Sequence, residues 1–194
     1  MNEACRAPYT MTNSHSDAQA LADTLRAKRL PPVADWHPER CSSIDIRIAR
    51  DGSWHHEGTP IKRKSLYRLF STVLRRDDDD EYYLVTPAEK LRIRVDDAPF
   101  HAVSMEVSGT GTGQQLIFTT NCDDRVSCDA GHPLRVDIDA ASGEPSPYVL
   151  VRDRLEALIA RPVFYQIVDL ADTRNEQLGI WSGGCYFTLG SIRD

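Results

Sequence analysis

The stretch "SIDIRIARDGSWHHE", residues 43–57, decides the fold class. Isoleucines occupy every second position over residues 44–48, and a period of two is typical of a strand that buries one face. An Asp-Gly pair at residues 51–52 then supplies the tight turn of a β-hairpin, and the residues after it return as the partner strand. This segment therefore predicts an antiparallel β-sheet.

A helical pattern follows the hairpin. Apolar residues recur at positions i, i+3, i+4, i+7 and i+8, which is one face of an amphipathic helix. The helix is expected to run from about Arg63 to about Arg76. Its apolar positions are Leu66, Leu69, Phe70, Val73 and Leu74.

Most of the chain after this helix consists of short apolar or alternating segments separated by turn-rich pieces. Strands are expected at residues 82–85, 91–95, 103–107, 116–118, 125–128, 134–138 and 148–151, with a last one at residues 185–189. Many short strands in succession predict a curved antiparallel sheet or half-barrel. Together with the helix, they predict an α+β fold.

Helical spacing returns from about Asp153. Three apolar residues then share a helical face: Leu155, Leu158 and Ile159. Pro162 interrupts this pattern, and a proline is tolerated where it opens a second helical segment. We therefore expect helix on both sides of Pro162.

An internal repeat is visible when the sequence is shifted against itself by about 89 residues. The shift aligns Leu66 with Leu155 and Arg63 with Arg152, so each half would hold strands followed by a helix that starts at an arginine. The alternative is that any two strand–turn–helix segments can be aligned in this way. We interpret the pattern as a duplication, with domains at residues 17–84 and 85–194 and a disordered tail at residues 1–16.

Composition and charge limit the functions open to this chain. Its 194 residues are 41% hydrophobic and carry a net charge of −6, which argues against binding to a nucleic-acid polymer or a membrane surface. The N-terminus lacks the apolar core of a secretory leader, and the five cysteines are scattered without a Cys-x-x-Cys pair. We therefore expect a cytoplasmic protein with reduced thiols and no cofactor.

The run Asp77–Asp80 raises the question of a metal site. A calcium loop spaces its ligands at alternate positions and includes a glycine for the bend, and neither feature occurs here. A solvated loop beyond the end of a helix is the interpretation that we favour.

A basic cluster at the start of the first helix is more informative. Residues 61–76 contain six basic residues and no acidic one. A helix N-terminus suits phosphate, and arginine binds phosphate in bidentate fashion. Arg152 and Arg154 would occupy the equivalent place in the second half. The alternatives are an anion site and a solvated charged surface.

Motifs for catalysis are weak in this sequence. The stretch "SGTGTGQQ" at residues 108–115 is followed by a strand, whereas a phosphate-binding loop must open a helix. It is therefore expected to be a hairpin loop. The sequence has no His-Glu-x-x-His and no Gly-x-Ser-x-Gly. We expect a non-catalytic protein, with an unrecognised hydrolase as the alternative.

Several long motifs nevertheless occur together in order. They are "DIRIARDGSWHHEGTPIKRKSLYRLFSTVLRR", "YYLVTPAEKLRIRVDDAPF", "HPLRV", "PYVLVRDRLEALIARPVFYQIV" and "WSGG". With these motifs the chain resembles the bacterial family catalogued as domain of unknown function 1285, over roughly residues 31–189. The resemblance implies a duplicated α+β architecture, a C-terminal domain superficially similar to pleckstrin-homology folds, and a signalling role.

The resemblance also implies a cleft between the domains for a small phosphorylated, nucleotide-like ligand. On this chain the motif positions would be Arg47, Arg63, Thr86, Glu89, Asn121, Arg152, Arg161, Tyr165 and Trp181. The arginines would pair with phosphate, and Tyr165 or Trp181 would stack on a base. The competing hypothesis is a protein-interaction adaptor that uses the strand-rich C-terminal half and binds a protein partner.

Overall fold

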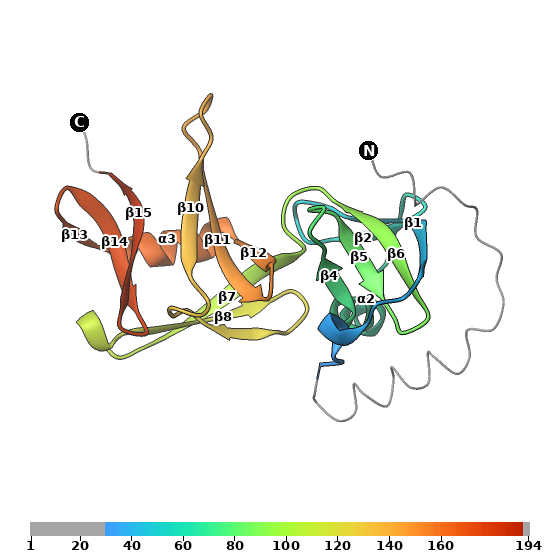
Figure 1. The fold of residues 1–194 in the computed structure, drawn as a ribbon. Helices are drawn as coiled ribbons and strands as arrows, with labels where there is room; N and C mark the ends of the chain where they lie inside the picture. The colour runs from blue at the N-terminus through green and yellow to red at the C-terminus, as the bar shows by residue number, and fades with distance from the viewer. Residues whose placement is uncertain (1–29, 192–194) are drawn as a thin grey trace. The chain divides into compact units, whose positions relative to one another are not determined.

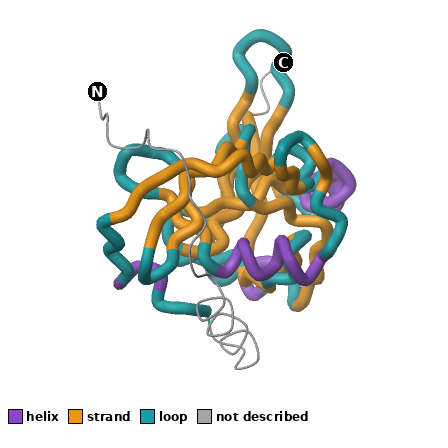
Figure 2. The backbone as a smooth tube through the Cα atoms, turned by 90° about the vertical axis from the view of Figure 1, so that its right-hand side faces the viewer, coloured by secondary structure: helices purple, strands orange, loops and turns teal. Residues whose placement is uncertain are grey.

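The structure is a computed structural model that describes residues 30–191. The tail predicted at residues 1–16 and residues 17–29 of the predicted first domain lie outside the described residues. The chain forms two compact units: the first ends at Asp96 but leaves out Arg50–Gly52, which belong to the second with the chain from Asp97 onward. In each unit, strands make up more of the chain than helices do (Figure 2).

In the described residues, the first unit contains a six-stranded sheet in the order β3-β2-β1-β6-β5-β4, together with the helix α2 (Figure 1). The outer strands pair antiparallel, and the central pair β1 and β6 is parallel. The elements are the 3-10 helix η1 (Val33–Asp35), β1 (Arg40–Ile48), β2 (Trp54–His56), β3 (Thr59–Pro60), α2 (Lys64–Thr72), β4 (Leu74–Arg76), β5 (Tyr82–Val85) and β6 (Glu89–Val95).

The core of the first unit joins the sheet to α2. The ring of Trp54 on β2 lies 6.1 Å from the ring of Phe70 on α2, and Trp54 is almost fully buried. The predicted hairpin at residues 44–56 is confirmed, because Ile46 and Ile48 are buried and pair with β2 across a turn that contains Gly52 with φ 80°. A left-handed φ of this kind favours glycine.

The first helix is shorter than its apolar pattern predicts. It ends at Thr72, where the hydroxyls of Ser71 and Thr72 donate to the carbonyls three residues earlier, at 2.8 and 2.7 Å. Val73 and Leu74 are buried, but Leu74 pairs with Leu84 as part of β4. The prediction of helix up to Arg76 was therefore wrong, because burial in a strand continued the same apolar spacing.

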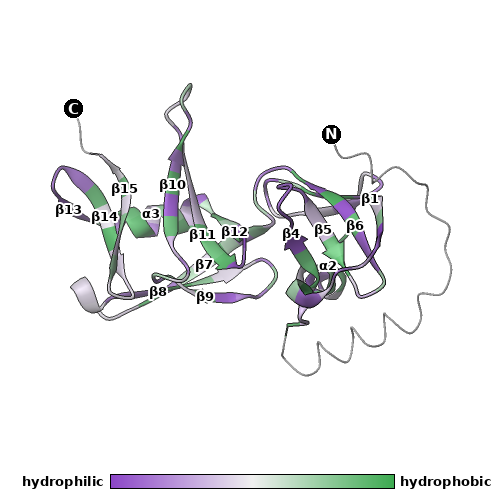
Figure 3. Cartoon of the chain, viewed as in Figure 1, coloured by the Kyte–Doolittle hydropathy of each residue, from purple (hydrophilic) through white to green (hydrophobic). Residues whose placement is uncertain are grey.

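Within residues 30–191, the second unit contains a six-stranded sheet in the order β10-β11-β12-β7-β8-β9 and a three-stranded sheet β13-β14-β15. The helix α3 packs against β7 and β14, and its inward side is hydrophobic (Figure 3). The elements are β7 (Phe100–Ser108), η2 (Gly111–Gly113), β8 (Gln115–Thr120), β9 (Arg125–Ser127), β10 (Leu134–Ile138), β11 (Pro145–Arg152), β12 (Leu155–Ile159), α3 (Arg161–Asp169), β13 (Asp172–Arg174), β14 (Gln177–Ser182) and β15 (Cys185–Ser191).

The helix predicted from about Asp153 is wrong, because residues 155–159 form the strand β12. Four of its five residues are buried, and three of them are consecutive, so both faces of β12 are covered. A strand buried on both faces has no period of two. The helix predicted after Pro162 is confirmed, with the proline in the first turn of α3. The stretch at residues 108–115 lies between β7 and β8, as predicted for a hairpin loop.

The duplication is present in the topology of the sheets. In each unit, two three-stranded antiparallel meanders join through a parallel pair, β1 with β6 and β12 with β7. Strands β1–β6 therefore correspond in order to β7–β12. The predicted alignment of Leu66 with Leu155 was wrong, because it placed a helix on a strand. The boundary predicted between residues 84 and 85 falls within β5, which pairs with β4 and with β6 in one sheet.

No helix among residues 30–191 has the length and apolar character that a bilayer crossing requires. The free thiols of this range belong to Cys122, Cys128 and Cys185, whereas Cys41 is disulfide-bonded. The expectation of reduced thiols was therefore wrong for Cys41.

The aspartate run forms the turn between β4 and β5, as predicted for a loop, but its first residue is half-buried and paired. The carboxylate of Asp77 accepts hydrogen bonds from Arg75 and from Lys90 Nζ, the latter at 2.8 Å. Arg75 also donates to the carbonyls of Val33 and Trp36. Burial alone would raise the pKa of Asp77, but the two cations hold it below its ordinary value. This cluster ties η1 to the sheet.

The substitution Asp77→Asn should lower the free energy of unfolding by about 1 kcal/mol at pH 7. A carboxyl whose folded pKa is depressed contributes stability above the unfolded pKa of about 3.9, and this stability is lost as the pH falls through the folded value. Denaturant unfolding at several pH values should therefore show a difference at pH 7 that shrinks as the pH falls below the unfolded pKa and through the lower folded pKa. The control is Asp35→Asn, at an exposed position; an equal effect of both variants would contradict this account.

Candidate functional site

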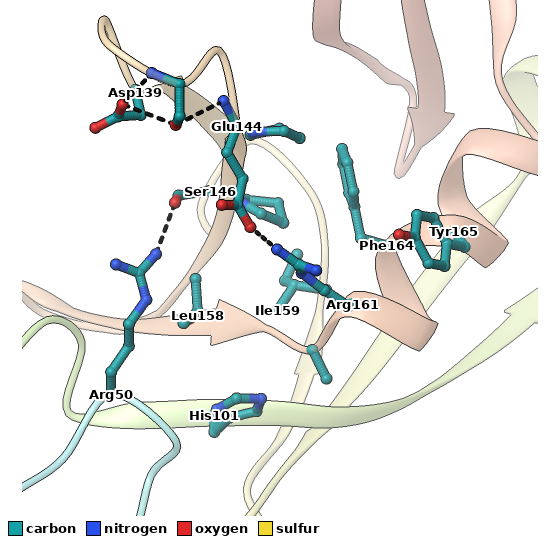
Figure 4. A pocket seen from close by; sticks show the side chains of 14 residues that line it. Arg50, His101, Asp139, Glu144, Ser146, Leu158, Ile159, Arg161, Phe164 and Tyr165 are labelled. Carbon is teal, nitrogen blue, oxygen red and sulfur yellow. Dashed lines mark hydrogen bonds and ion pairs between the residues drawn. The ribbon is translucent and has the colours of Figure 1, made fainter.

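A pocket of about 720 Å³ lies in the second unit, between the β10–β11 hairpin, the end of β12 and the start of α3 (Figure 4). Its apolar wall includes Leu158, Ile159 and Phe164. The lining residues with polar groups are Arg50, His101, Asp139, Ser142, Glu144, Ser146, Arg161 and Tyr165. Pockets of this size bind small molecules in many proteins.

Helix α3 places two of these groups on one wall. Arg161 and Tyr165 are four residues apart, so they lie on the same face of the helix, one turn from each other. Val163 and Ile167 point to the opposite side and are buried in the core, which fixes the rotation of the helix. Tyr165 is 61% exposed, so its ring is open to a ligand.

Arg50 comes from the turn between β1 and β2. Its guanidinium donates to the hydroxyl of Ser146 at 2.9 Å and lies 3.3 Å from the carboxylate of Asp97. The hydroxyl of Tyr148 also donates to Asp97, at 2.8 Å. Burial, together with this carboxylate, raises the pKa of Tyr148 to about 12. Tyr148 therefore stays a neutral donor under ordinary conditions.

His101 is held at the pocket by Asn121. The Asn121 side chain accepts from the backbone N–H of His101 at 3.1 Å and donates to the carbonyl of Gly52 at 2.8 Å. The Nδ1 atom of His101 is buried and has no hydrogen-bond partner among the described residues. Because this nitrogen is shielded from solvent, it is not an open donor or acceptor of the pocket.

Two carboxylates face the cations. Glu144 forms an ion pair with Arg161. Asp139 accepts hydrogen bonds from the N–H groups of Ala141 and Ser142 and from the Ser142 hydroxyl. These bonds, the backbone N–H of Ser142 first, hold the pKa of Asp139 below its ordinary value. Asp139 is therefore charged, and its carboxylate stabilises the hairpin tip through these hydrogen bonds.

The structure gathers some of the predicted site residues here. Arg161 and Tyr165 line the pocket, and Asn121 supports it from behind. Two other predicted residues of the second unit, Arg152 and Trp181, lie outside the lining. The polar lining residues that the sequence did not indicate come from separate turns and strands: Arg50, His101, Asp139, Ser142, Glu144 and Ser146.

Arg152 does not begin a helix, so that prediction was wrong. It is the last residue of β11, where it lies 3.1 Å from the carboxylate of Asp124 and stacks over the ring of Phe100. Trp181 on β14 packs edge-on against Tyr186 at 5.4 Å between ring centroids. Both residues have structural contacts in these positions.

The remaining predicted site residues belong to the first unit. Arg47 forms an ion pair with Asp96, and Arg63 is the exposed residue that precedes α2. Thr86 and Glu89 close the β5–β6 turn, where the Thr86 hydroxyl donates to the Glu89 carbonyl at 3.1 Å. A role of these residues in ligand binding stays a prediction.

The pocket combines hydrogen-bond donors, an aromatic ring and an apolar wall. Small-molecule sites in proteins are commonly built from groups of these kinds. Among residues 30–191, no three side chains of His, Cys, Asp or Glu are grouped so as to hold a metal ion. The geometry thus defines a class: an α+β protein of two strand-rich units, the second of which carries a polar pocket.

Comparison with known proteins gives the family. The chain matches the models of "Domain of unknown function (DUF1285), N-terminal domain" over residues 31–98 and "Protein of unknown function (DUF1285), C-terminal domain" over residues 99–189. The chain belongs to the DUF1285 family, which confirms the resemblance seen in its sequence. No curated protein matches the chain.

Two solved structures are similar to this chain. A DUF1285 family protein from Silicibacter pomeroyi DSS-3 is 48% identical with a TM-score of 0.81, over 89% of this chain and 95% of that one. A DUF1285 family protein from Shewanella baltica OS155 is 25% identical with a TM-score of 0.52, over 66% of this chain and 94% of that one. Both neighbours are described by family alone.

Proposed function

We propose that this protein is a non-catalytic, cytoplasmic signalling module that binds a small anionic, nucleotide-like ligand in the pocket of its second unit. The observation that carries the proposal is the placement of Arg161 and Tyr165 one helical turn apart on the pocket wall. An arginine can bind a phosphate group in bidentate fashion, and an exposed aromatic ring can stack on a base.

Further support comes from the other donors of the pocket. Arg50 lies on the side of the pocket opposite to Arg161, and its side chain is 63% exposed (Figure 4). A ligand with phosphate at one end and a ring at the other would use the two arginines and Tyr165 together.

A thermal-shift panel of nucleotides and inorganic phosphate tests the proposal. A ligand at about 100 times its Kd should add about 2.7 kcal/mol of stability. Arg161→Gln should weaken the best compound about tenfold, because a charged hydrogen bond is lost. Arg125→Gln is the matched control, since Arg125 on β9 pairs with Glu106 on β7, and neither residue lines the pocket.

Tyr165→Leu separates the two halves of the expected ligand. Loss of stacking, about 1–3 kcal/mol per base in other systems, should weaken nucleotides and leave inorganic phosphate unchanged. A panel in which no compound stabilises the protein would contradict the proposal, as would equal affinities of the Arg161→Gln and Arg125→Gln variants.

A protein-interaction adaptor is the second candidate. Val103 and Val107 on β7 are 51% and 41% exposed, and exposed apolar side chains on a strand suit contact with a protein partner. The adaptor would be favoured if no nucleotide binds and if Val107→Asp abolishes a reproducible protein complex while leaving the fold intact.

A further inference from the structure

The ion pair between Glu144 and Arg161 has a consequence for the proposed anion site. The carboxylate of Glu144 lies against the guanidinium that would bind the ligand, and both residues line the pocket (Figure 4). We infer that Glu144 is an internal competitor of the ligand. Its carboxylate pairs with the Arg161 guanidinium until a ligand anion displaces it. This inference rests on the proposed function and adds a regulation and a ligand class to it.

The hairpin tip brings Glu144 to this place. The N–H of Gly143 donates to the Asp139 carbonyl at 2.8 Å, and the N–H of Asp139 donates to the Glu144 carbonyl at 3.0 Å. Gly143 has φ 70°, a left-handed conformation that glycine adopts without strain. The Asp139 carboxylate holds the residues between them through Ala141 and Ser142. The tip is therefore a closed turn whose own hydrogen bonds fix the backbone of Glu144.

The start of α3 also stabilises the Glu144 carboxylate in this position. Arg161 is the first residue of α3, and Ala160 before it makes no side-chain cap. A helix N-terminus favours a nearby negative charge, and the Glu144 carboxylate supplies one. The Glu144 side chain is nevertheless 53% exposed and that of Arg161 71% exposed. An ion pair this exposed is weak, so a ligand can displace Glu144.

The competition selects for the charge of the ligand. A ligand carboxylate would only replace one carboxylate by another, and so gains little from Arg161. A phosphate monoester carries close to two negative charges at neutral pH, with three acceptor oxygens. The ligand class that this pocket favours is therefore a dianionic phosphate. Removal of the Glu144 charge should improve the binding of phosphate and should also admit single carboxylates.

The test compares Glu144→Gln with Asp137→Asn, using inorganic phosphate and acetate as probes in isothermal titration. Both variants remove one negative charge from the same hairpin, but Asp137 pairs with Arg135 and does not line the pocket. An exposed ion pair is worth up to about 1 kcal/mol, or about fivefold in Kd. We expect Glu144→Gln to bind phosphate about fivefold more tightly, and Asp137→Asn to match the wild type.

The outcomes separate the inference from the function on which it rests. If wild type and Glu144→Gln bind phosphate with the same Kd, the competitor role is overturned and the pocket remains a binding site. If phosphate binds to neither, nor to Glu144→Ala, the proposed anion site and the competitor role both fall. Tighter phosphate binding by Glu144→Gln and Glu144→Ala alone, with acetate binding detectable only in these two variants, supports the inference.

Discussion

Replacing Gly179 with alanine should lower the free energy of unfolding by about 3 kcal/mol, at the upper end of what overpacking usually costs. A Cβ at this position of β14 would lie 2.5 Å from Cζ of Tyr186 and 2.6 Å from the carbonyl oxygen of Phe187. The Tyr186 ring cannot easily move away, because its hydroxyl donates to the carbonyls of Asp172 and Gln177 at 2.9 and 3.3 Å. Only a residue without a side chain leaves room for the ring.

Denaturant unfolding measures this effect, and the neighbouring strand offers a matched control. A Cβ at Gly190 of β15 would meet nothing within 4 Å, so Gly190→Ala should change the stability little. In the double variant Gly179→Ala/Tyr186→Ala, the first substitution should cost less than in the wild type, although the contact with the Phe187 carbonyl remains. Equal losses for the two single glycine variants would show that packing of the Tyr186 ring does not require Gly179.

The strands with one buried face were predictable from the sequence. β1 alternates clearly because one side of its sheet is solvated, and the same argument identified β6. Alternation also identified β7 and β10, although Val103, Val107 and Ile138 on these strands are exposed. β12 lacked this signal, because both of its faces are covered and its apolar residues also fit a helical spacing. Periodicity cannot separate a doubly buried strand from one turn and a half of buried helix. The internal repeat was therefore recognised, but a helix of the first unit was aligned with a strand of the second.

The candidate site was predictable only where it is local. Arg161 and Tyr165 lie on one helix, so their spacing places them together. Arg50 and His101 reach the same pocket from a turn and a strand that are distant in sequence, and only the pairing of β12 with β7 and the turn at Gly52 bring them near. The partner of Arg161 comes from the tip of another hairpin, which no local pattern connects with α3.

The substitution Ser182→Ala should lower the free energy of unfolding by about 2 kcal/mol. Ser182 is fully buried at the end of β14, where its hydroxyl donates to the Cys128 carbonyl at 2.6 Å and accepts from the Leu116 N–H at 2.9 Å. The Cys128 carbonyl keeps a second donor, Gln115 Nε2 at 3.0 Å, whereas the Leu116 N–H loses this acceptor. The cost is therefore that of a buried donor left without its partner. The exposed Ser127→Ala on β9 is the control.

Alkylation of Cys128 reports the same change by a second route. Burial raises the pKa of this thiol to about 12, so in the folded protein it should react only when the structure opens. Where opening is fast relative to alkylation, the rate follows the population of the open form. A loss of about 2 kcal/mol should then speed the reaction about 30-fold in Ser182→Ala, with little change at the half-buried Cys185. If Cys128 reacts equally fast in Ser182→Ala and Ser127→Ala, the Ser182 hydroxyl does not hold the three-stranded sheet against β8.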